Sequence, residues 1–110
     1  MKPLKDATHL YAVENRHYHA DRENFRIVEL QISKDQKIPW HKHSTVDDIF
    51  YVWKGALTIY LQDPKEKVHL QEKEMYSVAA GRPHLVTNAL DTSTTFFVIQ
   101  DGDYDNIQLT

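Results

Sequence analysis

Cysteine is absent from the 110 residues of the sequence. Its absence excludes a disulfide framework, a thiolate metal site and a catalytic cysteine nucleophile. The sequence also lacks a run of about 18 apolar residues, the length that a membrane-spanning helix requires. Residues 1–6 contain no apolar segment of the kind found in secretory signals. We therefore expect a cytoplasmic protein with no membrane partner.

Clusters of basic residues are absent as well, and the formal net charge is −3. Because proteins that bind nucleic acids usually carry a basic face or stripe, we expect no nucleic-acid partner. Hydrophobic residues make up 41% and charged residues 26% of the chain, the balance of an ordinary globular protein. This length and composition predict one domain that can bury a core without disulfides.

Strand periodicity runs through most of the chain. Residues 26–32 alternate between polar and apolar side chains, which predicts a strand with one buried face. Residues 48–53 are apolar, aromatic and β-branched, which is typical of a strand buried on both faces or placed at an interface. Residues 56–62 alternate again after a turn at Gly55. Shorter strands are expected at 68–70, 75–78, 85–88, 95–100 and 106–109. This series predicts an all-β sandwich or closed barrel.

The N-terminal part of the chain is harder to assign, because its first twenty residues show only a weak helical periodicity. We divide the chain into an N-terminal segment, residues 1–24, and a β-barrel, residues 25–110. The sequence leaves open whether the segment adds a strand at the barrel edge, exchanges a strand with a second copy, closes a pocket or frays.

Two of the seven histidines, His41 and His43, are separated by one residue. In a strand, such residues point to the same face with Cβ atoms roughly 6.5–7 Å apart. Two imidazoles at this spacing can bind one metal ion at about 2.0–2.1 Å each. Asp47 and Asp48 follow, and a carboxylate beside neutral imidazoles completes a mixed ligand set suited to first-row divalent metals. His17 and His19 have the same spacing. No carboxylate, buried strand and glycine turn follow them, so we interpret that pair as partly exposed strand histidines.

Two motifs strengthen the interpretation of His41 and His43. The segment from His41 to Asp48, followed by six residues and Gly55, resembles the first cupin motif: His-x-His, three or four residues, a Glu, six residues and a Gly. The segment from Gly81 to Asn88 resembles the second motif: a Gly, two residues, a His, three residues and an Asn. Both motifs occur in order, so the chain resembles a small single-domain member of the cupin superfamily.

The resemblance implies a six- to eight-stranded double-stranded β-helix, the jelly-roll barrel, with a metal ion near one mouth. It assigns the metal ligands to His41, His43, Asp48 and His84. Iron, manganese, nickel, copper and zinc all remain candidates for the one divalent ion, because this ligand set does not select among them. The resemblance also implies a small-molecule partner and a homodimer. The aromatic residues that cluster around the first motif are a candidate dimer interface, namely Trp40, Phe50, Tyr51 and Trp53.

The sequence departs from the cupin motifs at four positions. Asp35 and Lys73 stand where the motifs have a leading glycine, and Ala79 stands where the second has a proline. These three positions concern loop shape. Asp48 replaces the usual Glu and is one methylene shorter, so it must approach the metal closely or reach it through a water. Asp47 is the rival carboxylate, but the six-residue spacing to Gly55 favours Asp48.

Two classes of function follow from a cupin metal site. In the first, the protein is a metal-dependent dioxygenase, isomerase or lyase acting on a small polar metabolite. Weak candidates for its acid, base or anion-binding group are Tyr51, Tyr60, Tyr76 and Arg26. In the second class, the barrel is a non-catalytic binding module for a sugar or an organic acid. Asn88 shares a face with His84, and its expected role is to support a loop.

Overall fold

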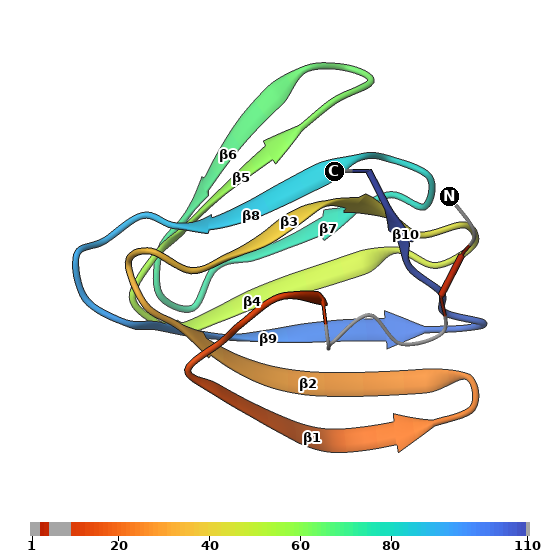
Figure 1. Cartoon of the computed structure of the whole chain (residues 1–110), viewed down its shortest axis with the longest axis horizontal. Coiled ribbons are helices and arrows are strands. Elements are labelled where there is room, and N and C mark those ends of the chain that lie inside the picture. Colours follow the sequence, from red (N-terminus) through yellow and green to blue (C-terminus); the bar gives the residue numbers. More distant parts are fainter. Residues whose placement is uncertain (1–2, 5–9, 110) are drawn as a thin grey trace.

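A computed structural model describes residues 3–4 and 10–109. Its strands form two five-stranded sheets, in the orders β1-β2-β9-β4-β7 and β10-β3-β8-β5-β6, with every pairing antiparallel (Figure 1). The strands are β1 (Asn15–Arg22), β2 (Phe25–Ile32), β3 (Lys37–Lys42), β4 (Asp48–Lys54), β5 (Leu57–Leu61), β6 (Glu66–Leu70), β7 (Met75–Val78), β8 (His84–Asn88), β9 (Thr94–Asp101) and β10 (Ile107–Gln108). The predicted fold class, an all-β double-stranded β-helix, is confirmed.

The core of the barrel lies between the two sheets and takes inward-facing residues from strands β2 to β9. The largest fully buried apolar side chains are Phe50, Phe96, Leu30, Ile32, Leu57, Ile59, Leu61, Val52, Val78 and Val86. Buried polar residues also stand on the strands, among them His41 on β3, Asp48 at the start of β4, His84 at the start of β8 and Gln100 near the end of β9. The alternation of the strands therefore places polar side chains within an otherwise apolar core. Such buried polar groups require hydrogen-bond partners, so we expect them to contact one another.

The N-terminal segment differs from the weak helical pattern in its sequence. Residues Asn15–Arg22 form β1, which pairs with β2 at the edge of the first sheet. Arg16 and Tyr18 are half-buried, whereas His17 and His19 are exposed, so this stretch has the period of a strand. The interpretation of His17 and His19 as exposed strand histidines is confirmed. The division of the chain at residue 24 stays a prediction.

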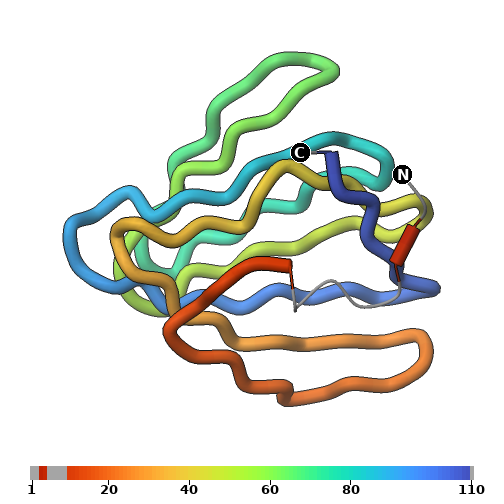
Figure 2. Tube along the Cα trace, viewed as in Figure 1, coloured from red at the N-terminus to blue at the C-terminus, as the bar shows by residue number. Residues whose placement is uncertain are grey.

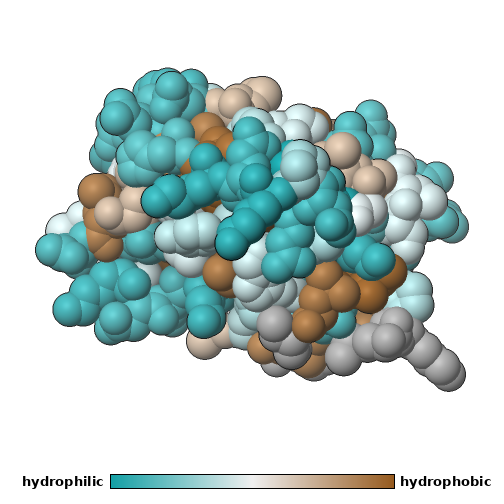
Figure 3. Space-filling model, turned by 90° about the horizontal axis from the view of Figure 1, so that it is seen from above, coloured by the Kyte–Doolittle hydropathy of each residue, from teal (hydrophilic) through white to brown (hydrophobic). Residues whose placement is uncertain are grey.

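The path of the chain shows how the hairpins are arranged (Figure 2). The β5–β6 hairpin extends beyond the rest of its sheet, and β1 and β2 form a second hairpin at the opposite edge of the molecule (Figure 2). Seen from the side of the β5–β6 hairpin, the surface is mainly hydrophilic, with small separate hydrophobic patches (Figure 3). None of the described residues belongs to a helix long and apolar enough to cross a membrane.

Two turn positions explain how the sequence tolerates its departures from the cupin motifs. Lys73, which stands at a glycine position, still adopts the left-handed backbone with φ +69°. Its Nζ lies 3.4 Å from the centre of the Trp53 ring, a cation–π contact that helps to hold this turn. Asp35 lies in a turn where Gln36 N–H donates to the Ser33 carbonyl at 3.2 Å. The turns therefore form without the glycines.

Gly55 shows the opposite behaviour, because both its backbone and its surroundings require glycine. Its φ is +101°, and a Cβ there would lie 2.4 Å from Thr94 Oγ1 and 2.9 Å from Thr94 Cα. Thr94 cannot easily move, since its hydroxyl accepts from Ala56 N–H at 3.2 Å and donates to Asn88 Oδ1 at 2.7 Å. This contact fixes the turn that connects β4, which carries Asp48, to β5.

We expect Gly55→Ala to lower the free energy of unfolding by about 2–4 kcal/mol, because it adds backbone strain to a steric clash. Gly81→Ala is the matched control. Gly81 also has a positive φ, of +80°, but no atom lies within 4 Å of the position of its Cβ. Its cost should be about 1–2 kcal/mol, from the backbone alone. Chemical denaturation measures both, and equal losses would contradict the role given to Thr94.

Candidate metal centre

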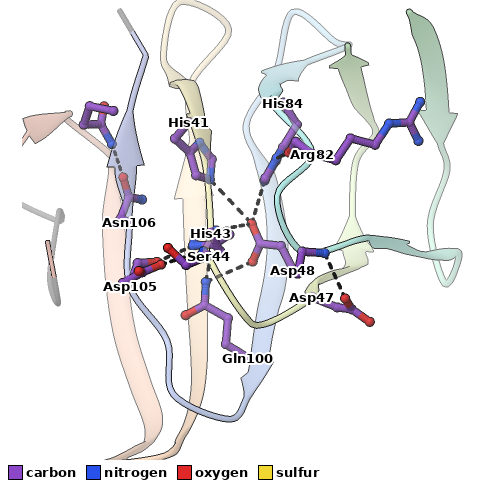
Figure 4. Close-up of polar contacts among 12 residues, drawn as sticks. His41, His43, Ser44, Asp47, Asp48, Arg82, His84, Gln100, Asp105 and Asn106 are labelled. Carbon is purple, nitrogen blue, oxygen red and sulfur yellow. Dashed lines mark hydrogen bonds and ion pairs between the residues drawn. The ribbon is translucent and has the colours of Figure 1, made fainter. Parts of the chain in front are cut away.

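Four predicted ligands come together inside one end of the barrel (Figure 4). His41 on β3 lies directly opposite His84 on β8 in the antiparallel ladder. His43 comes one residue after β3, and Asp48 is the first residue of β4. Each of the four is at most 3% exposed. Strand pairing therefore brings together two motifs that are separate in the sequence.

Asp48 is the hub of the cluster. Its Oδ2 atom lies 2.8 Å from Nε2 of His84, 3.0 Å from Nε2 of His43 and 3.5 Å from Nε2 of His41. The four potential ligand atoms all lie within 4.8 Å of one another. Asp47 is exposed and points away, and its Oδ1 accepts from Ala80 N–H at 3.0 Å (Figure 4). The structure thus places Asp48, and not Asp47, among the histidines.

The opposite side of each imidazole is held by a backbone carbonyl. Nδ1 of His41 donates to the Pro39 carbonyl at 2.8 Å, and Nδ1 of His84 donates to the Arg82 carbonyl at 2.9 Å. Nδ1 of His43 donates to the Asp105 carbonyl. Such bonds are the usual outer contacts of metal-binding histidines, because they fix the orientation of the ring and leave Nε2 as the ligand atom.

These hydrogen bonds decide which atoms carry protons. A carbonyl oxygen can only accept, so each Nδ1 is protonated, and in a neutral imidazole Nε2 then presents a lone pair. Three such lone pairs would face one carboxylate oxygen, an arrangement that is repulsive unless a proton or a metal cation lies between them. The donor set is three nitrogens and one oxygen, with fixed rings and a buried setting. It fits a divalent transition metal ion.

The charges within the cluster follow from burial and from these contacts. Burial raises the pKa of Asp48, but the positive charge on His43 and the polar contacts with all three imidazoles outweigh it and hold that pKa well below its usual range. Burial lowers the pKa of His41. Burial also opposes protonation of His43, but the Asp48 carboxylate and the Asp105 carbonyl outweigh it, so the pKa of His43 is raised. In the metal-free cluster, a proton on His43 is the favoured countercharge to Asp48.

Gln100 supports the cluster and was not predicted from the sequence. Its Nε2 donates to Asp48 Oδ1 at 3.0 Å and lies 3.4 Å from Nε2 of His43. The amide therefore holds the carboxylate oxygen that is turned away from the histidines (Figure 4). A sequence signal was present, because Gln100 is in phase with the buried Phe96 and Val98 and is thus a polar residue at an inward position.

A cavity of about 50 Å³ adjoins the cluster. Arg26 lines it, together with Arg16, which the sequence did not single out. The other lining residues are Tyr11, Tyr18, Val28, Leu30, Ile38, His41, His43, Asp48, Phe50, Val98, Gln100, Tyr104, Asp105 and Asn106. One end of the barrel therefore combines the candidate ligands, two arginines and an aromatic wall.

The three candidate tyrosines are not among the residues that line this cavity. Tyr51 points outward from β4, where its ring lies 6.3 Å from that of Phe97. Tyr60 is 38% exposed on β5. The Tyr76 hydroxyl accepts from Arg82 Nη1 at 3.4 Å. Their residue type made them candidates, but the direction of each side chain depends on strand phase and pairing.

Asn88 lies at the opposite end of β8 from His84 and holds a loop, as expected. Its Nδ2 donates to the carbonyls of Thr92 at 2.8 Å and Ile32 at 3.2 Å. Its Oδ1 accepts from Leu90 N–H at 3.0 Å and from the Thr94 hydroxyl at 2.7 Å. All four contacts are to protein groups, so this side chain has a structural role.

Comparison with known proteins identifies the class to which this fold and cluster belong. The chain matches the profile of the cupin domain family, Cupin_2, over residues 28–100, and it belongs to that family. No curated protein matches the sequence.

Solved cupin structures share the fold at low sequence identity. A cupin-2 domain containing protein from Shewanella frigidimarina is 21% identical with a TM-score of 0.67, covering 82% of each chain. An uncharacterized conserved protein with a double-stranded β-helix domain from Klebsiella pneumoniae is 15% identical with a TM-score of 0.72, covering 91% of this chain and 84% of its own. Oxalate decarboxylase from Lactobacillus farciminis, a formate complex, is 14% identical with a TM-score of 0.71. That match covers 79% of this chain but only 27% of the decarboxylase.

The charge on Asp48 sets the protonation of His43 in the metal-free protein, and Asp48→Asn tests this. We expect the pKa of His43 to fall in this variant, because burial is then opposed only by the contact with Asp105. An NMR titration of the imidazole ring signals measures the change. Asp47→Asn, the same substitution at the neighbouring exposed position, should leave the pKa of His43 unaltered. An unchanged pKa of His43 in the Asp48→Asn variant would contradict the conclusion that the charge on Asp48 sets the protonation of His43.

Proposed function

We propose that the protein is a metal-dependent cupin enzyme that acts on a small polar metabolite, and that His41, His43, Asp48 and His84 hold its metal. The observation that carries the proposal is the convergence of three Nε2 atoms on one buried carboxylate oxygen, with every Nδ1 already bonded to a carbonyl. Burying these four polar groups beside one another without a bound cation contributes little to the stability of the fold. A cation between them accounts for the arrangement.

The chain's own residues support such a site in three ways. The backbone carbonyls fix the imidazole rings, and Gln100 fixes Asp48, so the ligands are in place before a metal arrives. Phe50 and Val98 line the adjoining cavity and keep bulk water from one of its walls. A bound divalent ion would supply Lewis-acid chemistry, and a redox-active one would add electron transfer. Dioxygenase, isomerase and lyase reactions are all consistent with this site.

Metal content is the first test. Protein purified without chelator, or reconstituted with iron, manganese, nickel, copper or zinc, should carry near-stoichiometric metal by elemental analysis. The double variant His41→Ala/His84→Ala should lose it, because two of the four ligands are gone. The matched control is His17→Ala/His19→Ala, which removes the exposed pair of the same spacing and should retain the metal. A wild type without metal after reconstitution with every ion would refute the site.

The same metal-loaded protein separates the two classes of function. A panel of small polar metabolites is assayed for oxygen consumption, isomerisation and bond cleavage. Turnover that follows metal content and disappears in the His41/His84 variant supports an enzyme. Saturable binding with no turnover across the panel would instead favour a non-catalytic module for an organic acid or a sugar.

We also propose a homodimer formed through the outer face of the sheet that contains β2, β9 and β4. Ile27, Ile99 and Ile49 lie side by side across these three strands, and the neighbouring row places Phe97 beside Tyr51. All five side chains are partly exposed. In-register rows of this kind form a continuous apolar surface, which is unusual on the exposed face of a monomer. Phe50 is fully buried and cannot contribute to the interface directly.

Sedimentation velocity should therefore show a particle of twice the mass of the chain. Ile99→Lys places a charge at the centre of the isoleucine row and should shift the equilibrium towards monomer. The control is Tyr60→Lys on the outer face of the other sheet, where Tyr60 is 38% exposed. A monomeric wild type, or equal effects of the two substitutions, would contradict this interface.

A further inference from the structure

Two arginines face the cavity from the edge of the first sheet. Arg16 on β1 and Arg26 on β2 both line it, across from the histidine cluster. The side chain of Arg26 is only 12% exposed. Two guanidinium groups in one cavity repel each other and lose hydration, so their placement calls for a compensating group.

The compensation within the described residues is incomplete. Nε and Nη2 of Arg16 and Nε of Arg26 are buried and have no hydrogen-bond partner. Asp21 is the acidic group nearest to Arg26, but its Oδ1 lies 3.5 Å from Nε, and it is bonded to the Tyr104 hydroxyl at 3.0 Å. Buried donors of a charged group are rarely left unpaired in a native protein, which indicates that a ligand supplies the missing acceptors.

Aromatic rings keep the two guanidinium groups in position. The Arg26 guanidinium lies 4.2 Å from the centre of the Tyr104 ring and 5.5 Å from that of Tyr18. The Arg16 guanidinium lies 5.3 Å from the centre of the Tyr11 ring. These rings restrict the positions of both guanidinium groups within the cavity.

The charge balance of the cavity favours an anion once a metal is present. Its lining holds two arginines and two aspartates, Asp48 and Asp105, so these four side chains have no net charge. Asp105 Oδ1 is already engaged, because it accepts from Ser44 N–H at 2.8 Å. A divalent cation at the histidine cluster would leave the cavity positively charged. A negatively charged ligand would restore the balance.

The size and lining of the cavity restrict that anion. The cavity volume of about 50 Å³ favours a small anion. The lining includes Val28, Leu30 and Val98, which offer no hydrogen-bond donors. A tetrahedral phosphate would turn oxygens towards these apolar groups. A carboxylate presents two oxygens on one side and carbon on the other.

We propose that Arg16 and Arg26 bind the carboxylate of a small carboxylic acid, which is the substrate or ligand of the adjoining centre. The proposal deepens the metal-dependent function and rests on it for the role of the acid, but the arginine site itself is present in the chain without metal. The N–H groups of the two arginines donate to the two carboxylate oxygens, and the rest of the molecule extends towards the histidines.

Binding of glycolate, a two-carbon hydroxy acid, tests this site, with glycolamide as its neutral counterpart of the same shape. Isothermal titration calorimetry is performed on the full chain loaded with zinc, and on the chain stripped with a chelating resin. Glycolate should bind the metal-stripped wild type about tenfold or more tightly than glycolamide, because without zinc only the arginines distinguish the charged acceptors of glycolate from the neutral amide. Equal affinities would overturn the proposal.

Variants locate the interaction. Arg16→Gln and Arg26→Gln should each weaken glycolate binding by about tenfold or more while leaving zinc content unchanged. Arg22→Gln is the matched control, since Arg22 is an exposed arginine of the same strand as Arg16. Its affinity for glycolate should equal that of the wild type. Because the glycolate–glycolamide comparison uses the wild type, it decides the question even if a cavity variant fails to fold.

The outcomes separate this site from the metal proposal. Zinc binding without a preference for glycolate would overturn the arginine site and leave the metal centre standing. Arginine-dependent glycolate binding by a chain that takes up no metal would support the carboxylate site and refute the metal-dependent function. Inorganic phosphate is titrated in parallel, and a phosphate affinity above that of glycolate would overturn the assignment to carboxylic acids.

Discussion

The contact between Asp48 and three imidazoles is the constraint on which the structure of this end of the barrel depends. One carboxylate oxygen lies within 3.5 Å of three Nε2 atoms, and those atoms come from two strands and a loop. The arrangement requires that His41 and His84 pair across β3 and β8 and that β4 begins at Asp48. It also requires backbone carbonyls behind every ring. A change in strand register would move these side chains to the opposite face of their sheet.

The positions around the site differ in how readily they accept a residue that departs from the motif. Lys73 occupies a glycine position in a left-handed conformation, and the turn forms nevertheless, because the side chain extends over Trp53. Gly55 has no such freedom, since Thr94 lies against the position that a Cβ would take. The shorter Asp48 is likewise accommodated, because Gln100 and the three histidines all approach it within the core. The motif positions that contact buried strand residues therefore accept fewer residue types than the positions in exposed turns.

Much of this could be predicted from the sequence, for physical reasons. Strand alternation predicted β2 and β5, the apolar and β-branched composition of residues 48–53 predicted β4, and the two-residue spacing of His41 and His43 placed them on one face. The choice of Asp48 over Asp47 followed from the six-residue spacing to Gly55. Gln100 and Arg16 were not predicted, because their roles depend on which strands become neighbours. β1 in particular has polar residues on both faces, so its sequence pattern does not indicate which face is turned inward. Its pairing with β2 determines that orientation.

The position of β1 has a consequence for how this barrel can diversify. Among the strands of residues 10–109, β1 pairs only with β2, whereas the strands that carry His41 and His84 each have neighbours on both sides. Substitutions at Arg16 or Tyr18 therefore alter the wall of the cavity without disturbing an interior ladder. The candidate ligands lie on interior strands and in a loop, whereas Arg16 and Tyr18 lie on an edge strand. The cavity lining can therefore vary at this edge while the candidate ligands keep their positions.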